Sequence, residues 1–138
     1  MRWKLNSGVL SWRNDKKYLI NWDKPSRSKE QTKVKEFLRQ YWEKDVVYEE
    51  YRLPQDLLRV DFINASKKIT IEHQGKGAHQ YNKFFHDNSR AKYLASIKRD
   101  VKKRKFLEDN GFLFIETFTE ELDRLSKELF WEKYKIVL

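Results

Sequence analysis

A chain of 138 residues with 39% hydrophobic and 15% aromatic side chains can fill one compact core, which excludes an intrinsically disordered protein. Its 30 Lys and Arg residues against 21 Asp and Glu residues give a net charge of +9, which favours polyanions, nucleic acid first among them. The chain has no cysteine and no apolar stretch long enough for a signal peptide or a membrane span, so we expect no membrane partner, no secretion and a reducing cytoplasm.

The first 25 residues predict an N-terminal β-hairpin that precedes the main domain. Residues 9–12 and 17–22 have strand-like composition and flank a polar turn at residues 13–16. The tryptophans of this segment could stack on nucleic-acid bases, but tryptophan in a small domain usually packs internally. We therefore expect a structural role for them.

A helix is predicted to begin near Ser28, whose hydroxyl can cap the free amides of the first turn. The apolar side chains that follow share one helix face, at Val34, Phe37, Leu38 and Tyr41. This face should cover one side of a sheet. Three strands are predicted next, over residues 46–52, 57–64 and 68–74, and the short turns between them favour an antiparallel meander.

A second helix is predicted over residues 89–110, with a left-handed cap at Asn110-Gly111. Its apolar residues fall roughly on one side, opposite a dense cationic face: Leu94, Ile97, Val101 and Leu107. Residues 112–115 form an apolar run typical of a strand covered on both faces and added parallel to the sheet. A last helix should span residues 119–131. The order helix, three strands, helix, strand, helix predicts one α/β domain with a central mixed sheet over residues 26–138.

Asp61 and Glu72 interrupt two of the predicted strands as polar residues within apolar sequence. If these strands are neighbours, the carboxylates can meet at one end of the sheet and bind Mg²⁺ or Mn²⁺, hard ions that take carboxylate and phosphate oxygens. The alternative is that both face solvent from the polar side of a half-exposed sheet. Further groups capable of chemistry follow at once, at Gln74, Gly75, Lys76 and His79. This local density favours a functional site.

Asp61 followed by Glu72-His73-Gln74 on the next strand resembles the PD-(D/E)xK nuclease motif, an acidic residue and then acidic-any-Lys. More narrowly, the sequence is similar to the branch of very-short-patch-repair endonucleases and some phage homing endonucleases. The stretches that carry this narrower likeness are Glu50-Tyr51, Val60-Asp61-Phe62, Ile71-Glu72-His73-Gln74-Gly75 with His79, Arg99-Asp100, Lys103 and residues 106–112. The likeness covers roughly residues 26–117 and leaves the hairpin of residues 1–25 unexplained.

The resemblance implies a restriction-endonuclease-like domain that hydrolyses DNA phosphodiester bonds with Mg²⁺ or Mn²⁺. It implies that Asp61 is the principal metal ligand, that Glu72 is a second ligand and that Glu50 is an acidic residue supporting the site. His79 would act near the scissile phosphate, where a neutral imidazole can take a proton from the attacking water. The implied catalytic set is therefore Glu50, Asp61, Glu72, Gln74 and His79.

Two departures from the family pattern affect the detailed roles. Gln74 stands where the motif lysine is usual. Its amide can orient water or a phosphate oxygen, and Lys76 could restore the positive charge. Relatives often carry a glutamate on the first helix that faces the site, and this chain offers adjacent Glu30 and Gln31, between which the sequence does not choose.

The second helix could add groups to the site and to DNA binding. Asp100 and Lys103 could reach the site, or they belong to a solvated charged face. Five cations are interpreted as a track for DNA phosphates: Lys98, Arg99, Lys102, Arg104 and Lys105. The plainer alternative is that basic residues only keep the protein soluble.

The leading functional prediction is a metal-dependent DNA endonuclease that serves phage homing, recombination or repair in a bacterial or phage-infected cytoplasm. A branched-DNA resolvase uses the same chemistry, and dimerisation is left open. An alternative from another class is a catalytically inactive nucleic-acid-binding module on a nuclease fold, which Gln74 in the lysine position favours. The joint presence of Asp61, Glu72, Glu50 and His79 argues against such a relic.

Overall fold

The fold is seen in a computed structural model, which describes residues 1–55, 59–75 and 90–138. A four-stranded sheet lies at the centre, with strands β3 (Val47–Arg52), β4 (Arg59–Asn64), β5 (Ile69–Gly75) and β6 (Leu113–Phe118) in that spatial order. The strands β3, β4 and β5 are antiparallel neighbours, and β6 is parallel to β5. The predicted α/β fold with a mixed sheet is therefore confirmed.

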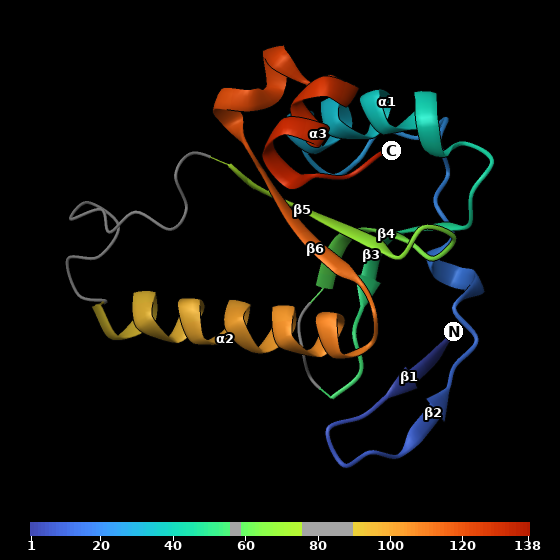
Figure 1. Cartoon of the computed structure of the whole chain (residues 1–138), viewed down its shortest axis with the longest axis vertical. Helices are drawn as coiled ribbons and strands as arrows, with labels where there is room; N and C mark the ends of the chain where they lie inside the picture. Colours follow the sequence, from blue (N-terminus) through green and yellow to red (C-terminus); the bar gives the residue numbers. More distant parts are fainter. Residues whose placement is uncertain (56–58, 76–89) are drawn as a thin grey trace.

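Helices cover both faces of this sheet (Figure 1). The helices α1 (Lys29–Trp42) and α3 (Lys127–Tyr134) lie on one face, and α2 (Arg90–Asp109) lies on the other. None of the helices in the described part of the chain is long and apolar enough to cross a membrane.

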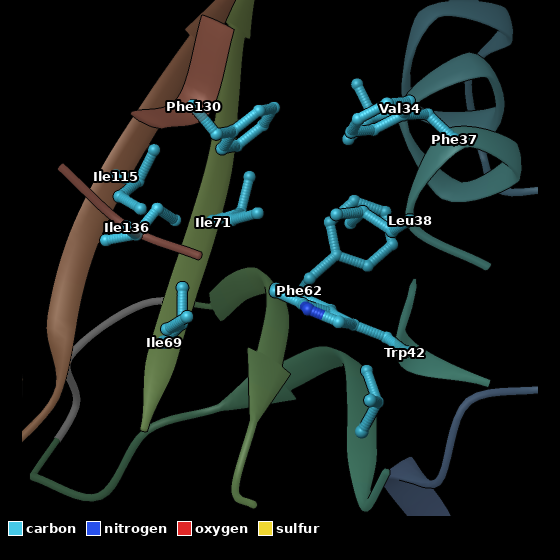
Figure 2. Packing of buried hydrophobic residues seen from close by; sticks show 11 residues of the cluster. Val34, Phe37, Leu38, Trp42, Phe62, Ile69, Ile71, Ile115, Phe130 and Ile136 are labelled. Carbon is cyan, nitrogen blue, oxygen red and sulfur yellow. The ribbon is translucent and has the colours of Figure 1, made fainter. Parts of the chain in front are cut away.

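The helix α1 begins where the sequence predicts, because the Ser28 hydroxyl oxygen accepts a hydrogen bond from the backbone N–H of Gln31 at 3.1 Å. Its apolar face packs on the sheet beside Phe130 of α3 (Figure 2). The buried apolar residues of this cluster are Val34, Phe37, Leu38, Trp42, Val47, Phe62, Ile69, Ile71, Ile115, Phe130 and Ile136. Burial of these side chains is the main force that holds the helices on this face.

The N-terminal hairpin exists, but the predicted pairing of residues 9–12 with residues 17–22 is wrong. The strands are β1 (Arg2–Lys4) and β2 (Leu10–Trp12), which pair antiparallel. Trp3 decides the pairing because its ring is buried in the second apolar cluster, on the α2 face of the sheet. The predicted second strand instead contains a short 3₁₀ helix, Lys16–Tyr18, and then an isolated bridge from Leu19 to the edge strand β3.

The inner face of α2 also differs from the prediction. Leu94 and Val101 are exposed, whereas Phe106 and Leu107 are buried against the sheet. Figure 1 shows the cause, since the N-terminal half of α2 extends past the described strands of the sheet. The left-handed cap is confirmed, since Gly111 has a φ of +84°.

The C-terminal region forms two short helices rather than the one predicted over residues 119–131. A 3₁₀ helix, Thr119–Arg124, follows β6, and α3 begins only at Lys127. The Ser126 hydroxyl oxygen accepts a hydrogen bond from the backbone N–H of Leu129 at 3.1 Å and so starts a new helix.

Candidate functional site

The candidate site lies where the pairing of β4 with β5 stops. The regular pairs run from Asn64 opposite Ile69 to Phe62 opposite Ile71, and the next positions in this register are Asp61 and Glu72. At this point a side chain replaces the backbone hydrogen bonds between the two strands, because Oδ2 of Asp61 accepts a hydrogen bond from the His73 backbone N–H at 2.8 Å. The predicted carboxylates therefore come together at one end of the sheet.

A backbone irregularity marks the same point on the neighbouring strand β3. The register of β3 and β4 places Glu50 opposite Asp61. Glu50 has a φ of 51°, a left-handed conformation that costs a residue with a side chain about 1–2 kcal/mol. The alternation of side chains is also interrupted at Asp61, since Val60 and Phe62 pack in clusters on opposite faces. Strain of this kind is concentrated at functional sites.

The Asp61 carboxyl is buried beside other acids. Burial, together with the charges of Glu72 and Glu50, raises its pKa to about 7, although the hydrogen bond from the His73 amide opposes the shift. Within the described residues no hydrogen bond reaches the other carboxyl oxygen, Oδ1. A buried oxygen of Glu50, Oε2, likewise has no hydrogen-bond partner in this part of the chain. Such groups favour a cation or an ordered water between them.

Glu72 is paired with a buried cation, Lys103, whereas the exposed side chains of Arg27 and Arg59 lie 3.4 Å and 3.7 Å from the Glu50 carboxylate. Lys103 of α2 donates hydrogen bonds from Nζ to Glu72 Oε1 at 2.8 Å and to the Arg59 carbonyl oxygen at 3.0 Å. Both side chains are largely buried. Burial raises the pKa of Glu72, and Lys103 opposes this shift. Lys103 therefore lies at the site, as the sequence suggested it could.

Two further predicted residues lie beside Glu72. The Gln74 amide donates a hydrogen bond from Nε2 to Glu72 Oε2 at 3.3 Å. Asp100 contacts none of the described site residues directly, although its charge contributes to the raised pKa of Glu72. Gln74 is thus a neighbour of the second carboxylate, and Asp100 acts on it only through its electric field.

The structure distinguishes the adjacent candidates on α1. Gln31 donates a hydrogen bond from Nε2 to Glu50 Oε1 at 2.9 Å, so it orients the strained acid. Glu30 lies elsewhere: its Oε1 is 2.8 Å from Nε2 of His73 and accepts a hydrogen bond from the Thr119 hydroxyl at 2.6 Å. Both residues support the site, but they do so through different strands.

His73 is the residue that sequence reasoning missed. Its ring is buried, with Nδ1 2.9 Å from the Thr117 hydroxyl oxygen and Nε2 against Glu30. Because a carboxylate only accepts, Nε2 carries a proton. This ring fixes the segment whose backbone N–H binds Asp61. The sequence did contain a signal for this role. His73 lies between Glu72 and Gln74 on one strand, and the alternation of side chains turns it to the other face, toward α1.

The five cations predicted to bind DNA phosphates differ in their surroundings on α2, and their role in DNA binding stays a prediction. Lys98, Arg99 and Lys102 are exposed and pair with no acid among the residues that the structure describes. Arg104 instead binds Glu116, with Nη2 2.7 Å from Oε1, and Lys105 binds Asp109 at 3.0 Å. Three of the five predicted cations therefore have no acidic partner within the described part of the chain.

Lys76 and His79 lie outside the described residues, so their predicted roles stay predictions. Among residues 1–55, 59–75 and 90–138, no group of three or more histidines or acids is arranged to hold a metal ion. The described site thus offers two carboxylates, from Asp61 and Glu72, and its metal-binding role also stays a prediction.

No protein-family model, no curated protein and no solved structure matches the chain. The resemblance to the PD-(D/E)xK nucleases therefore depends on the motif residues and their positions in the sheet.

Proposed function

We propose that the chain is a metal-dependent DNA endonuclease of the PD-(D/E)xK type. The observation that carries the proposal is the buried Asp61, which faces the strained Glu50 and lies beside Glu72 at the point where β4 and β5 part. Buried acids with raised pKa values and left-handed backbone at one spot destabilise a fold, and proteins retain such features chiefly where they serve chemistry.

The donor set fits Mg²⁺ or Mn²⁺. These ions take one or two carboxylates and fill their remaining positions with water and substrate phosphate oxygens, so Asp61 and Glu72 are enough protein ligands. Oδ1 of Asp61 accepts no hydrogen bond from the described residues and is the atom available to a cation, while Oε2 of Glu50, which has no hydrogen bond but lies 3.7 Å from Nη1 of Arg59, is available to the water of that cation. When bound, the ion would neutralise charge that develops on the phosphate.

Lys103 supplies the positive charge that Gln74 cannot. Its ammonium reaches the site from α2 rather than from β5, and its contact with Glu72 holds it there. A buried ammonium can stabilise the charge of a phosphoryl group in its transition state without reorganisation of solvent. We assign the role of the motif lysine to Lys103, with Gln74 orienting Glu72.

DNA is the proposed substrate. Lys98, Arg99 and Lys102 precede Lys103 on the same helix, and exposed cations spaced along a helix bind phosphates without reading sequence. The net charge of +9 acts in the same direction over longer range. The proposed setting is a bacterial or phage-infected cytoplasm, in homing, recombination or repair.

The test is cleavage of supercoiled plasmid and of labelled linear and four-way-junction DNA, with Mg²⁺, with Mn²⁺ and with chelator. Asp61→Asn and Glu72→Gln keep side-chain volume and should reduce the cleavage rate by at least ~10³-fold, about 4 kcal/mol. Asp23→Asn and Glu132→Gln are matched controls on exposed acids and should cleave like the wild type. Preference for the junction would identify a resolvase.

Failure of this proposal has a clear form. If no DNA is cut with either metal, and DNA binding is indifferent to chelator while it weakens as salt rises, the chain is a binding module. The engagement of both Glu72 oxygens by Lys103 and Gln74 is the observation that favours this alternative.

A further inference from the structure

The hairpin of β1 and β2 carries the most exposed tryptophan of the described structure. Trp12 is 75% exposed, and its neighbours Val9 and Leu10 are also largely open to solvent. A small domain that buries Trp3 and Trp42 completely has the means to bury an indole. An indole left on the surface among apolar neighbours indicates a contact with something outside the chain.

A guanidinium accompanies this indole. Arg2 pairs with Trp12 across the two strands, and its Cζ lies 5.6 Å from the centre of the Trp12 ring. A cation at this distance attracts the ring face and limits the orientations of both side chains. Nucleic-acid bases stack on both groups, on indole rings most strongly and on guanidinium planes.

The charge around Trp12 is positive and uncompensated on the surface. The exposed cations of residues 1–22 are Arg2, Lys4, Lys16 and Lys17. The one acid in this stretch, Asp15, is buried and paired with Arg13 and with the N-terminal ammonium. Residues 1–22 therefore have four surface cations and no surface acid, with Arg2 and Lys4 in the hairpin and Lys16 and Lys17 in the 3₁₀ helix that follows it, and such a segment is complementary to a polyanion.

The hairpin is fixed to the end of the helix that carries the basic residues. The Asn110 side chain accepts a hydrogen bond from the Lys4 backbone N–H at 2.7 Å and donates one to the Lys4 carbonyl oxygen at 3.1 Å. Trp3 packs on Phe112 and donates a hydrogen bond from Nε1 to the Tyr51 hydroxyl at 2.8 Å. Figure 1 shows the hairpin beside this end of α2.

We propose that this hairpin is a second nucleic-acid contact, in which Trp12 and Arg2 stack on an unpaired base and the surrounding lysines bind phosphates. The partner is DNA that exposes bases, at a single-stranded end, a gap or a branch. The proposal goes beyond the cleavage site and holds equally for a nuclease and for a binding module.

The test measures binding in chelator, where no cleavage interferes. Fluorescence anisotropy is recorded with a labelled 12-nucleotide single strand and with a blunt duplex of the same sequence. Trp12→Ala should weaken binding to the single strand by ~10-fold, in line with the loss of one stacked base, and binding to the duplex much less. Trp12→Phe should retain most of the affinity because it keeps an aromatic face.

Trp131 provides the matched control. It is 54% exposed on α3, far along the chain from the hairpin, and Trp131→Ala should leave both affinities unchanged. A strand with 2-aminopurine at one position gives the direct signature, because stacking on Trp12 quenches its fluorescence and Trp12→Ala abolishes the quenching. Thermal unfolding of each variant shows whether the fold is intact.

Three outcomes would overturn the proposal. Equal affinities of Trp12→Ala and wild type for the single strand would show that the indole takes no part. Equal losses for Trp12→Ala and Trp131→Ala would show a non-specific effect. A dimer in sedimentation that Trp12→Ala dissociates, without a change in DNA affinity, would assign the apolar hairpin to a second copy of the chain. None of these depends on cleavage by the Asp61 site.

Discussion

The two ends of the β4–β5 pair are built in opposite ways. At one end, Asn64 lies opposite Ile69 in a regular ladder, and the Asn64 side chain accepts a hydrogen bond from the Lys67 backbone N–H that closes the turn. At the other end the ladder stops, and burial raises the pKa of both Asp61 and Glu72, with the charge of Glu72 adding to the shift at Asp61. One pair of strands thus combines a stabilising end with an end that is costly to fold.

This difference indicates that one end of the β4–β5 pair stabilises the fold and the other end holds the candidate site. Apolar residues and the regular ladder at the Asn64 end hold the strands together. This allows the Asp61 end to keep acids and a left-handed Glu50 that would not be stable without support. Substitutions at the two ends should therefore have opposite effects on stability.

The largest expected effect on stability is at the apolar end. Ile69→Ala removes a buried side chain from the α1 face and should lower the free energy of unfolding by about 2–5 kcal/mol, because a cavity is left behind. Val101→Ala, at an exposed position of α2, should change it by less than about 0.5 kcal/mol. Urea unfolding measures both. A small effect of Ile69→Ala would contradict the assignment of this end as the stabilising one.

The buried acids at the Asp61 end should make the stability of the protein depend on pH. Folding raises the pKa of Asp61 to about 7, so between pH 4 and 7 the folded chain holds a proton that the unfolded chain has released. This group's contribution to stability therefore falls as pH rises through that range and is constant above it. Asp61→Asn removes this pH-dependent penalty. The free energy of unfolding of Asp61→Asn, taken relative to that of the wild type, should therefore be higher at pH 8 than at pH 4 by about 2–4 kcal/mol.

Thermal unfolding of wild type and Asp61→Asn from pH 4 to pH 8 tests this difference. Mg²⁺ at pH 8 should raise the melting temperature of the wild type and leave Asp61→Asn unchanged, since a ligand stabilises the state that binds it. Parallel pH profiles for the two proteins would refute the buried-acid explanation.

The pairing of Lys103 with Glu72 sharpens the comparison at the same end. Lys103→Met should lower kcat for DNA cleavage by ~100-fold, the usual loss when one preorganised charge is removed, with a smaller change in KM. Lys103→Arg keeps the charge and should recover part of the rate. Lys105→Met, on an exposed lysine of the same helix, is the control. Equal rates for Lys103→Met and Lys105→Met would remove Lys103 from the site.

The smallest expected effect is at Glu50. Glu50→Gly relieves the left-handed backbone and should stabilise the protein by about 1 kcal/mol, although Gly also increases the freedom of the unfolded chain. Glu50→Ala removes the same carboxylate and its hydrogen bond from Gln31 but keeps a Cβ, so the difference between the Gly and Ala variants isolates the backbone. A Glu50→Gly protein less stable than Glu50→Ala in urea would show that the conformation is not strained.

The fold could be predicted from the sequence where the residues of one helix or strand are enough to determine it. Ser28 caps α1, and the spacing of Val34 and Leu38 selects the face that is buried. The strand pairing within the hairpin could not be predicted, because it depends on burial of Trp3 by residues far along the chain. The inner face of α2 depends on where the sheet ends, which the sequence of α2 does not contain.

The candidate site divides in the same way. The meeting of Asp61 and Glu72 follows from two adjacent strands, so spacing was sufficient to predict it. The support by His73 was not predictable, because its ring meets Glu30 from α1 and Thr117 from β6 only in three dimensions. Lys103 was one of several cations on its helix, and only the packing of α2 selects it for burial.

The left-handed backbone at position 50 also bears on how related sequences should differ. If the proposed cleavage does not occur in a lineage, nothing selects for an acid there, and mutation would drift toward Gly or Asn, which adopt a φ near 51° with little strain. In a lineage with the proposed activity, Glu should persist against that drift. The residue found at this position across relatives is therefore a record of whether the site is in use.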